Sequence, residues 1–505
     1  MTIDGTAAAP VSYETDRAAF LGRGRTVADP LAMYRDQLGD SEGSVLDPIV
    51  AIRGRVVIAP DQVVRLHVAT GVAESRDGAM RLIEKYRDQH AVERVLALSW
   101  THSQVVQRRL EASNLDTQLF DRLASSVLYG NPTLRAPRGL IARNRGGQAG
   151  LWPYAISGDL PIILVRIADV ANLDLVRQLV KAHAYWRRKG LAADLVIWNE
   201  DPSGYRQVLQ DEIMAVIGGL ADVGLHDRPG GIFVRRSEQI AEHDKVLMQT
   251  VARVIVSDAD GTLADHLDRR PRSTVVSTDR RGHDRRTQPE HRAPSATTME
   301  VRTDLLAWNG HGGFTPDGRE YVIATTRDAC TPAPWVNVLA NPWFGTVISE
   351  SGSAYTWCEN AHSYRLSPWH NDAVTDASGE AFYLRDEDDG RYWSPTPLPA
   401  GADGSYTSRH GFGYSVFETT EAGIASTLTT YVATDAPVKF IVIKLRNVSG
   451  RRRALSLTGY VELVLGASRA GNAPHVVTEV DPGSRALLAR NAYNTEFAAR
   501  IAFLD

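Results

Sequence analysis

The sequence of 505 residues contains 43% hydrophobic and 23% charged residues, the composition of an ordinary soluble protein large enough for two or three domains. Its formal net charge of −4 argues against a nucleic-acid partner, and its two cysteines, Cys330 and Cys358, are too few for a disulfide scaffold or a thiolate metal site. No segment approaches the roughly 18 apolar residues needed to cross a bilayer, and the amino terminus lacks the pattern of a secretory signal. We therefore expect a cytoplasmic protein without a membrane span in this chain.

Residues 1–75 have the pattern of a partial β unit with a disordered amino terminus. Two short β-like runs, 49–58 and 63–68, are separated by turn residues. They predict a small piece of sheet rather than a complete domain.

From residue 76 to residue 257 the pattern becomes helical. Val176, Leu179, Val180 and His183 recur on one face of a predicted helix, which Asn172 would cap and Gly190 would end. We therefore expect residues 76–257 to form an α-helical region.

An arginine-rich linker is predicted at residues 258–300. Residues 266–298 carry eight arginines and three histidines without a sustained apolar pattern, which is typical of a solvated connection. A basic patch that touches anionic lipid or polyphosphate is the alternative interpretation.

Residues 301–505 have the texture of a large antiparallel β-sandwich. The run from Leu455 to Leu465 alternates with a period of two, and residues 439–446 precede it through a hairpin-like connection at 447–450. Together with the preceding regions, this predicts an α+β multidomain protein: a residual β segment, an α-helical region and then the sandwich.

Two segments carry the residue types of a carbohydrate site. Residues 334–372 interleave Trp and Tyr with Asn, Ser, Arg, His and Asp, and residues 409–414 (RHGFGY) add a second polar and aromatic loop. The apolar faces of pyranose rings stack on aromatic side chains, while their hydroxyl groups need planar amide, carboxylate and guanidinium partners. On composition alone, sugar binding and simple core filling are equally good explanations.

Several long, ordered segments resemble the amino-terminal sandwich of cellobiose-phosphorylase-type glycoside phosphorylases and, more narrowly, the phosphorylase region of cyclic β-1,2-glucan synthases. In the sandwich these are TPDGREYVI (315–323), PAPWVNVLANPWFGTVISESGSAYTW (332–357), NAHSYRLSPWHNDAVTD (360–376), EAFYLRDEDDGRYWSPTPLP (380–399) and RHGFGYSVFE (409–418). Upstream they are YETDRAAFLGRGR (13–25), LDPIVAIRGRV (46–56) and GLWPYAISGDLPIILVRI (150–167). The resemblance covers most of the chain, the linker excepted.

This resemblance implies a supersandwich and a part in inverting phosphorolysis of β-glucan. One carboxylic acid protonates the glycosidic oxygen while inorganic phosphate, as co-substrate, attacks the anomeric carbon, so no other cofactor is implied. In the family, the catalytic acid belongs to a helical barrel that follows the sandwich. Because we expect this chain to be a fragment that ends before that barrel, no catalytic residue is assigned and its own enzymatic activity is left open.

The resemblance leaves the sandwich a supporting role in binding β-1,2-glucan or a related glucan. The substrate-contact candidates are Arg365, Trp369, Asn371, Asp372, Arg409, His410 and Tyr414. The catalytic barrel would lie downstream or in a partner chain, with a homodimer left open, and the larger synthase could place this part at the inner membrane face.

Two alternatives belong to other classes. The chain could be a stand-alone glucan-binding or assembly subunit. A phosphatase of the haloacid dehalogenase type is suggested by the sequence DADGT at 258–262, which follows an apolar run, although arginine-rich sequence follows instead of an α/β domain. The fourteen histidines show no HxxxH or HExxH spacing, so no metal site is predicted.

Overall fold

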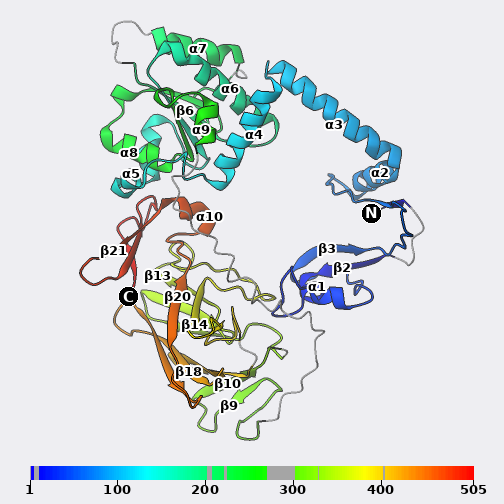
Figure 1. The fold of residues 1–505 in the computed structure, drawn as a ribbon, viewed down its shortest axis with the longest axis vertical. Helices are drawn as coiled ribbons and strands as arrows, with labels where there is room; N and C mark the ends of the chain where they lie inside the picture. Colours follow the sequence, from blue (N-terminus) through cyan, green and yellow to red (C-terminus); the bar gives the residue numbers. More distant parts are fainter. Residues whose placement is uncertain are drawn as a thin grey trace. The chain divides into compact units, whose positions relative to one another are not determined.

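The computed structural model describes residues 2–4, 11–201, 208–220, 224–269, 302–327, 329–401 and 404–505 (Figure 1). The chain divides into two compact units. Unit 1 comprises Met1–Arg87 and Arg280–Arg469, and unit 2 comprises Asp88–Asp279 and Ala470–Asp505. The larger segment of unit 2 therefore interrupts unit 1 in the sequence.

Unit 1 is built around a six-stranded antiparallel sheet in the order β19-β18-β17-β16-β10-β9. Its strands are β9 (Gly312–Phe314), β10 (Glu320–Thr325), β16 (Tyr406–Gly411), β17 (Tyr414–Glu421), β18 (Ile424–Val432) and β19 (Lys439–Asn447). Alternate residues of β18 are buried, which is the expected pattern for a strand with one face on a core. These strands supply one layer of the sandwich.

Two three-stranded antiparallel sheets complete the sandwich, in the orders β11-β12-β13 and β15-β14-β20. Their strands are β11 (Val336–Ala340), β12 (Phe344–Ser349), β13 (Ala354–Cys358), β14 (Glu380–Asp386), β15 (Tyr392–Trp393) and β20 (Leu455–Val461). Leu339 and Ile348 of the first sheet pack with Phe417 and Leu428 of the six-stranded sheet in one apolar cluster. The large antiparallel sandwich of the predicted fold class is thus confirmed.

The predicted hairpin between residues 439–446 and the following strand is wrong. β19 pairs with β18, whereas β20 pairs with β14 in another sheet. After β19 the chain turns back, and the amide of Val448 donates to the carbonyl of Gly423. Arg453 then pairs with Asp386 of β14, so the connection carries the chain from one sheet to the next.

The amino-terminal part of unit 1 holds small elements. β2 (Ser12–Asp16) pairs with β3 (Pro48–Arg53), and β1 (Thr2–Asp4) pairs with β4 (Arg65–His67). The helical elements are α1 (Arg17–Leu21), η1 (Leu31–Tyr34) and α2 (Arg76–Arg87). This agrees with the small piece of sheet expected before residue 75.

Unit 2 contains a four-stranded parallel sheet in the order β7-β6-β5-β8. The strands are β5 (Ile162–Ile167), β6 (Asp194–Asn199), β7 (Ile232–Arg236) and β8 (Val254–Ser257). The helical elements are α3 (Gln89–Arg109), α4 (Asn114–Tyr129), α5 (Arg138–Arg143), η2 (Gln148–Tyr154), η3 (Val170–Asn172), α6 (Leu173–Arg188), α7 (Val208–Leu220), η4 (Ser237–Gln239), α8 (Glu242–Val251), η5 (Asp258–Asp260) and α9 (Leu263–Asp268). Apolar clusters lie on both sides of the sheet, because its strands carry buried side chains on each face.

The interpretation of residues 76–257 as helical was therefore incomplete. Helix α6 carries Val176, Leu179, Val180 and His183 as buried residues, as its periodicity predicted. The four parallel strands were missed because a strand buried on both faces has a continuous apolar run instead of an alternation.

The carboxyl-terminal residues also differ from the expected sandwich. α10 (Arg469–Asn472) and η7 (Ala473–His475) lead into a separate antiparallel sheet in the order β21-β22-β23. Its strands, β21 (Val476–Val480), β22 (Leu487–Asn491) and β23 (Ile501–Leu504), belong to unit 2. Arg490 of β22 donates to the carbonyl oxygens of Ala142 and Asn144, which fastens this sheet beside α5.

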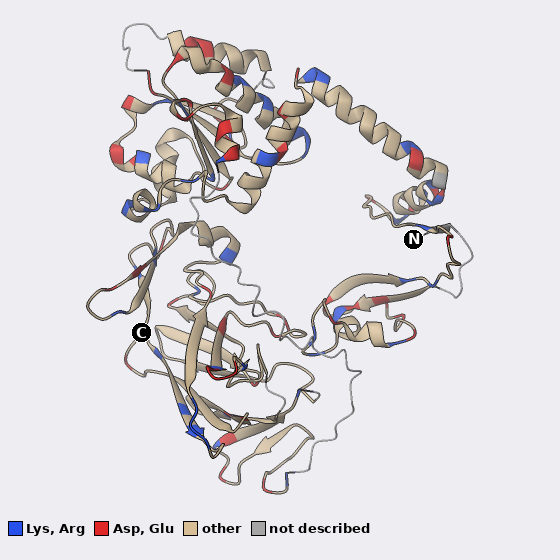
Figure 2. Ribbon diagram, viewed as in Figure 1, with Lys and Arg blue, Asp and Glu red and all other residues tan. Residues whose placement is uncertain are grey.

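The predicted linker, 258–300, is wrong at its beginning, because Asp258–Asp260 and Leu263–Asp268 form η5 and α9. The rest of it, from 270 onward, lies outside the described residues. In the described parts, both signs of charge occur in both units (Figure 2). None of the helices described here combines the length and the apolar character that a membrane span requires.

Candidate functional site

An aromatic platform lies along β13 and the loop that follows it. The ring of Trp369 is 4.7 Å from that of Tyr355, which in turn stacks on Trp357 at 5.2 Å. Tyr355 and Trp357 share a face because they are two residues apart on one strand. Trp357 lies over Gly345 of β12, where a Cβ atom would come within 2.2 Å of the indole ring. Glycine at this position therefore allows the platform to form.

Trp369 borders a cavity of about 260 Å³ in unit 1. Its side chain remains 39% exposed, so the ring can be reached from solvent. Polar groups of the rim come from the loop after Trp369, where Asn371 adopts a positive φ of 49°. The residues that line the cavity are Ala333, Pro334, Val336, Val347, Ser349, Ser353, Ala354, Tyr355, Pro368, Trp369, His370, Asn371, Asp372, Ala373, Asp376 and Ala377.

Asp372 is held by groups of the protein itself. Arg17 forms two hydrogen bonds of 2.8 Å with its two carboxylate oxygens, and the amides of Val374 and Thr375 donate to it at 3.0 Å. The Arg17 guanidinium holds the pKa of Asp372 well below its usual range. Asp372 therefore fixes the rim loop and joins it to the amino-terminal segment.

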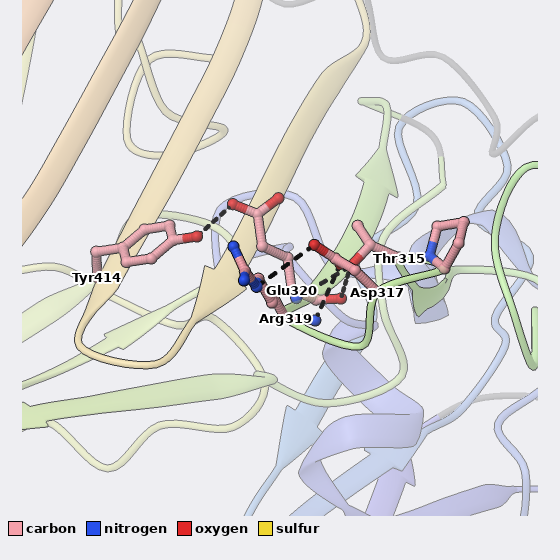
Figure 3. A pocket seen from close by; sticks show the side chains of 6 residues that line it. Thr315, Asp317, Arg319, Glu320 and Tyr414 are labelled. Carbon is pink, nitrogen blue, oxygen red and sulfur yellow. Dashed lines mark hydrogen bonds and ion pairs between the residues drawn. The ribbon is translucent and has the colours of Figure 1, made fainter.

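A second, more open depression of about 490 Å³ lies beside the β9–β10 turn (Figure 3). The hydroxyl of Tyr414 donates to Glu320 at 2.7 Å, and Arg409 pairs with Glu320 at 3.5 Å and with Glu418 at 3.2 Å. The hydrogen bond to Glu320 raises the pKa of Tyr414. The lining residues are Thr315, Pro316, Asp317, Arg319, Glu320 and Tyr414.

The start of β11 connects the two hollows. The two nitrogens of His410 contact the hydroxyl of Ser415 at 2.9 Å and the carbonyl of Trp335 at 3.1 Å. Asn337 donates to the carbonyl of Tyr414 at 3.0 Å. Val336, which lies between Trp335 and Asn337 in the sequence, lines the Trp369 cavity. Burial lowers the pKa of His410, so a neutral imidazole bridges the sheets.

The structure thus separates the seven predicted contact residues into groups. Trp369, Asn371 and Asp372 line one hollow, whereas Tyr414 lines the other, with Arg409 bound to its Glu320. His410 lies between them, as described above.

Arg365 lines neither hollow, and donates instead to the carbonyl oxygens of Ala361 and Ala467, each at 3.2 Å. Whether any of the seven predicted residues touches a sugar stays a prediction.

Sequence reasoning missed Tyr355, His370 and Glu320. The spacing of Tyr355 and Trp357, two residues apart, was a usable signal for the platform, since both side chains share one face of β13. Glu320 was hidden because its importance depends on the pairing of β10 with β16, which are far apart in the sequence.

The DADGT motif follows β8, at the carboxyl edge of the parallel sheet. A doubly wound sheet binds ligands at this edge, where its strand order reverses. Here one carboxylate oxygen of Asp258 accepts hydrogen bonds from the amides of Ala168 and Asp169 and from the side chain of Asn172. The donor groups of this loop therefore already form hydrogen bonds with Asp258.

This arrangement does not favour a phosphatase. Among the residues described, no three His, Cys, Asp or Glu side chains gather as a metal site would require. Asn172 precedes α6 as predicted, although its side chain bonds Asp258 rather than capping the helix.

The antiparallel architecture of unit 1 is that of a supersandwich domain. Residues 1–89 and 319–505 match the family described as glycosyl hydrolase 94, supersandwich domain. Since this is more than half of the chain, the chain belongs to that family. The interval between the two matched parts contains most of the α/β unit, which is thus inserted into the supersandwich sequence.

Similar proteins include glucan-forming and phosphorolytic enzymes. The chain is 34% identical to the cyclic beta-(1,2)-glucan synthase NdvB of Rhizobium meliloti over 496 residues, which are 97% of this chain and 18% of that protein. It is 32% identical to an N,N'-diacetylchitobiose phosphorylase of Vibrio furnissii over 34% of this chain and 22% of the relative. A solabiose phosphorylase of Paenibacillus borealis is 28% identical over 31% of this chain and 20% of the relative.

The chain spans about a fifth of the length of these relatives. Its resemblance to the synthase and phosphorylase family is confirmed, while these relatives support neither the phosphatase nor the separate assembly subunit.

Proposed function

We propose that this chain is the non-catalytic, carbohydrate-binding part of a β-1,2-glucan phosphorylase or cyclic β-1,2-glucan synthase. The observation that carries the proposal is the open cavity beside Trp369, with aromatic rings on one side and amide, imidazole and carboxylate groups on its rim. Similarity to the NdvB synthase over nearly the whole chain supports a β-1,2-linked glucan as the ligand.

In this proposal the apolar face of one glucose unit lies against Trp369. His370 and Asn371 are the nearest candidates for hydrogen bonds with its hydroxyl groups, while Asp372 keeps the rim in place through Arg17. Tyr414 and Glu320 would meet a neighbouring unit at the second hollow. The supporting role would be to hold the glucan while another domain carries out the phosphorolysis.

A catalytic barrel in the same polypeptide or in a partner chain would supply the acid, and inorganic phosphate would be the co-substrate. We also propose that the assembled protein acts in the cytoplasm, at the inner membrane face when part of a synthase. A homodimer is compatible with this division of labour.

The test is calorimetric titration of the purified chain with linear β-1,2-glucan. Wild-type protein should bind, and Trp369→Ala should weaken binding by about tenfold or more through loss of the stacking surface. Trp152→Ala is the matched control, because Trp152 is an exposed tryptophan of unit 2 and should not affect glucan affinity. An unchanged affinity in Trp369→Ala would refute the site.

The non-catalytic assignment has a separate readout. Incubation of the chain with linear β-1,2-glucan and phosphate should release no glucose 1-phosphate. Appreciable release would place the catalytic residues within this chain and overturn the assignment.

A further inference from the structure

A second cluster of unusual composition lies in unit 2, at the junction of α8 and η7. Arg135, which follows α4, donates from Nη2 to the carbonyl of Thr250 at 3.0 Å and to the carbonyl of Pro474 at 2.8 Å. One guanidinium therefore ties the end of α8 to the segment that enters the carboxyl-terminal sheet. Both bonds come from Nη2, so neither of them uses Nε or Nη1.

Two further nitrogen-bearing residues belong to segments beside Arg135, and the amide of Ile255 donates to the carbonyl of Leu134 at 2.7 Å. Pro474 directly precedes His475, and Thr250 lies three residues before Arg253. The His475 imidazole is fixed by a stack on Tyr493 at 4.1 Å and 22°. Two buried nitrogens of the cluster, Nε of Arg135 and Nδ1 of His475, have no hydrogen-bond partner among the described residues.

The cluster holds positive charge without a neutralising carboxylate. Burial and then the charge of Arg253 lower the pKa of Arg135. Burial, followed by the charges of Arg135 and Arg253, lowers the pKa of His475 to about 3. Within the described part of the chain, no acidic side chain pairs with either arginine. Like charges in a partly desolvated place are unfavourable unless an anion joins them.

We propose that Arg135, Arg253 and His475 form a binding site for an oxyanion of the phosphate class. Guanidinium groups suit this ligand because their planar donors match the spacing of phosphate oxygens. Arg135 is already oriented by the two carbonyls, so little side-chain freedom would be lost on binding. The ligand could be free inorganic phosphate or the phosphate group of a sugar phosphate. The site is independent of the Trp369 cavity, since every residue named here belongs to unit 2.

The experiment is calorimetric titration of the whole chain with inorganic phosphate and, in a second arm, with glucose 1-phosphate. Saturable binding by wild-type protein is expected, and Arg253→Gln should weaken it by about tenfold or more, because a charge-assisted contact is lost. Tighter binding of glucose 1-phosphate would identify a sugar phosphate as the source. Equal or tighter binding of inorganic phosphate would identify the free ion.

Arg188→Gln serves as the control, because Arg188 is an exposed arginine at the end of α6 and should leave binding unchanged. Arg253→Lys, which keeps the charge, should retain most of the affinity and gives a second measurement if Arg253→Gln does not fold. No saturation across the millimolar range, or wild-type affinity in Arg253→Gln, would overturn the site. Because glucan titration reports on unit 1, failure of this proposal leaves the glucan result untouched, and the reverse also holds.

Discussion

The two units are stabilised in different ways. The parallel sheet of unit 2 has apolar clusters on both faces, with residues such as Leu179 and Leu195 almost completely buried. The sandwich of unit 1 instead places ion pairs inside, among them Glu380 with Lys439 and Asp386 with Arg453. Apolar cores depend mainly on volume and pattern, whereas buried charges require each partner to be in place.

The Glu380–Lys439 pair shows what this requirement means. Glu380 is only 6% exposed and its Oε1 also accepts hydrogen bonds from Thr356 at 2.6 Å and Ser367 at 2.5 Å. Burial raises the pKa of Glu380, but Lys439 and these hydroxyl groups outweigh burial and lower it overall. The carboxylate is therefore stable inside the sandwich only while its neighbours remain.

The largest expected effect is that of Lys439→Met. This change leaves Glu380 buried without its counter-charge, and should destabilise unit 1 by about 3–5 kcal/mol. Hydrogen–deuterium exchange followed by peptide should show faster exchange in β14, β18 and β19, with the strands of unit 2 unaffected.

Lys444→Met on the same strand is the matched control, since Lys444 is exposed and its loss should cost little. Adding Glu380→Gln to Lys439→Met should recover part of the stability, because no buried charge remains. If Lys439→Met and Lys444→Met destabilised unit 1 equally, the buried ion pair would not be a source of stability particular to the sandwich.

Leu179→Ala tests the other side of the comparison. Leu179 is fully buried in the core cluster of unit 2, and removing its side chain should cost about 2–5 kcal/mol, as is usual for a cavity in an apolar core. Urea denaturation combined with peptide-level exchange should place the loss in unit 2 alone. Leu115→Ala provides the control, because Leu115 on α4 is 72% exposed. Accelerated exchange throughout the sandwich would mean that the units do not unfold separately.

This contrast explains how much of the fold could be predicted from the sequence. The period of α6 predicted its buried face correctly, whereas the alternation at Leu455–Val461 predicted the strand β20 but not its burial, which does not alternate. The parallel strands had no period to detect, and the pairing of β20 with β14 joins residues about 75 positions apart. Such a pairing depends on tertiary contacts that local patterns do not contain.

The candidate site was predictable to a similar extent. The mixture of aromatic and polar residues pointed to the segment that contains Trp369, and family resemblance directed attention to the same residues. The role of Asp372 could not be anticipated, because its partner Arg17 is 355 residues away in the sequence. Asp258 is the opposite case, because its motif suggested a catalytic role from the sequence. In the structure its carboxylate instead accepts hydrogen bonds from a neighbouring loop.

The smallest of the expected stability effects concerns that long-range pair. Arg17 joins the amino-terminal segment to the rim loop through Asp372, with side chains 24% and 18% exposed. Arg17→Gln should destabilise unit 1 by about 1–2 kcal/mol at neutral pH, the range for a charged hydrogen bond that is partly solvated. Arg25→Gln is the control from the same segment, because its partner Asp29 is only four residues away and 44% exposed, so the loss should be smaller.

The dependence on pH provides a more specific test of the Arg17–Asp372 pair. Because Arg17 lowers the pKa of Asp372 in the folded state, the stabilisation is complete above the ordinary value of 3.8 and is lost as the pH falls through the folded value. The stability difference between wild type and Arg17→Gln should therefore be constant from neutral pH to about pH 5 and shrink below about pH 4. Urea denaturation at a series of pH values measures this difference, in which the titrating groups that Arg17 does not contact cancel; Asp47, which Arg17 also bonds at 2.8 Å, is removed by adding Asp47→Asn to both proteins. If the stability difference between wild type and Arg17→Gln stayed constant below pH 4, Arg17 would stabilise the segment without involving the charge of Asp372.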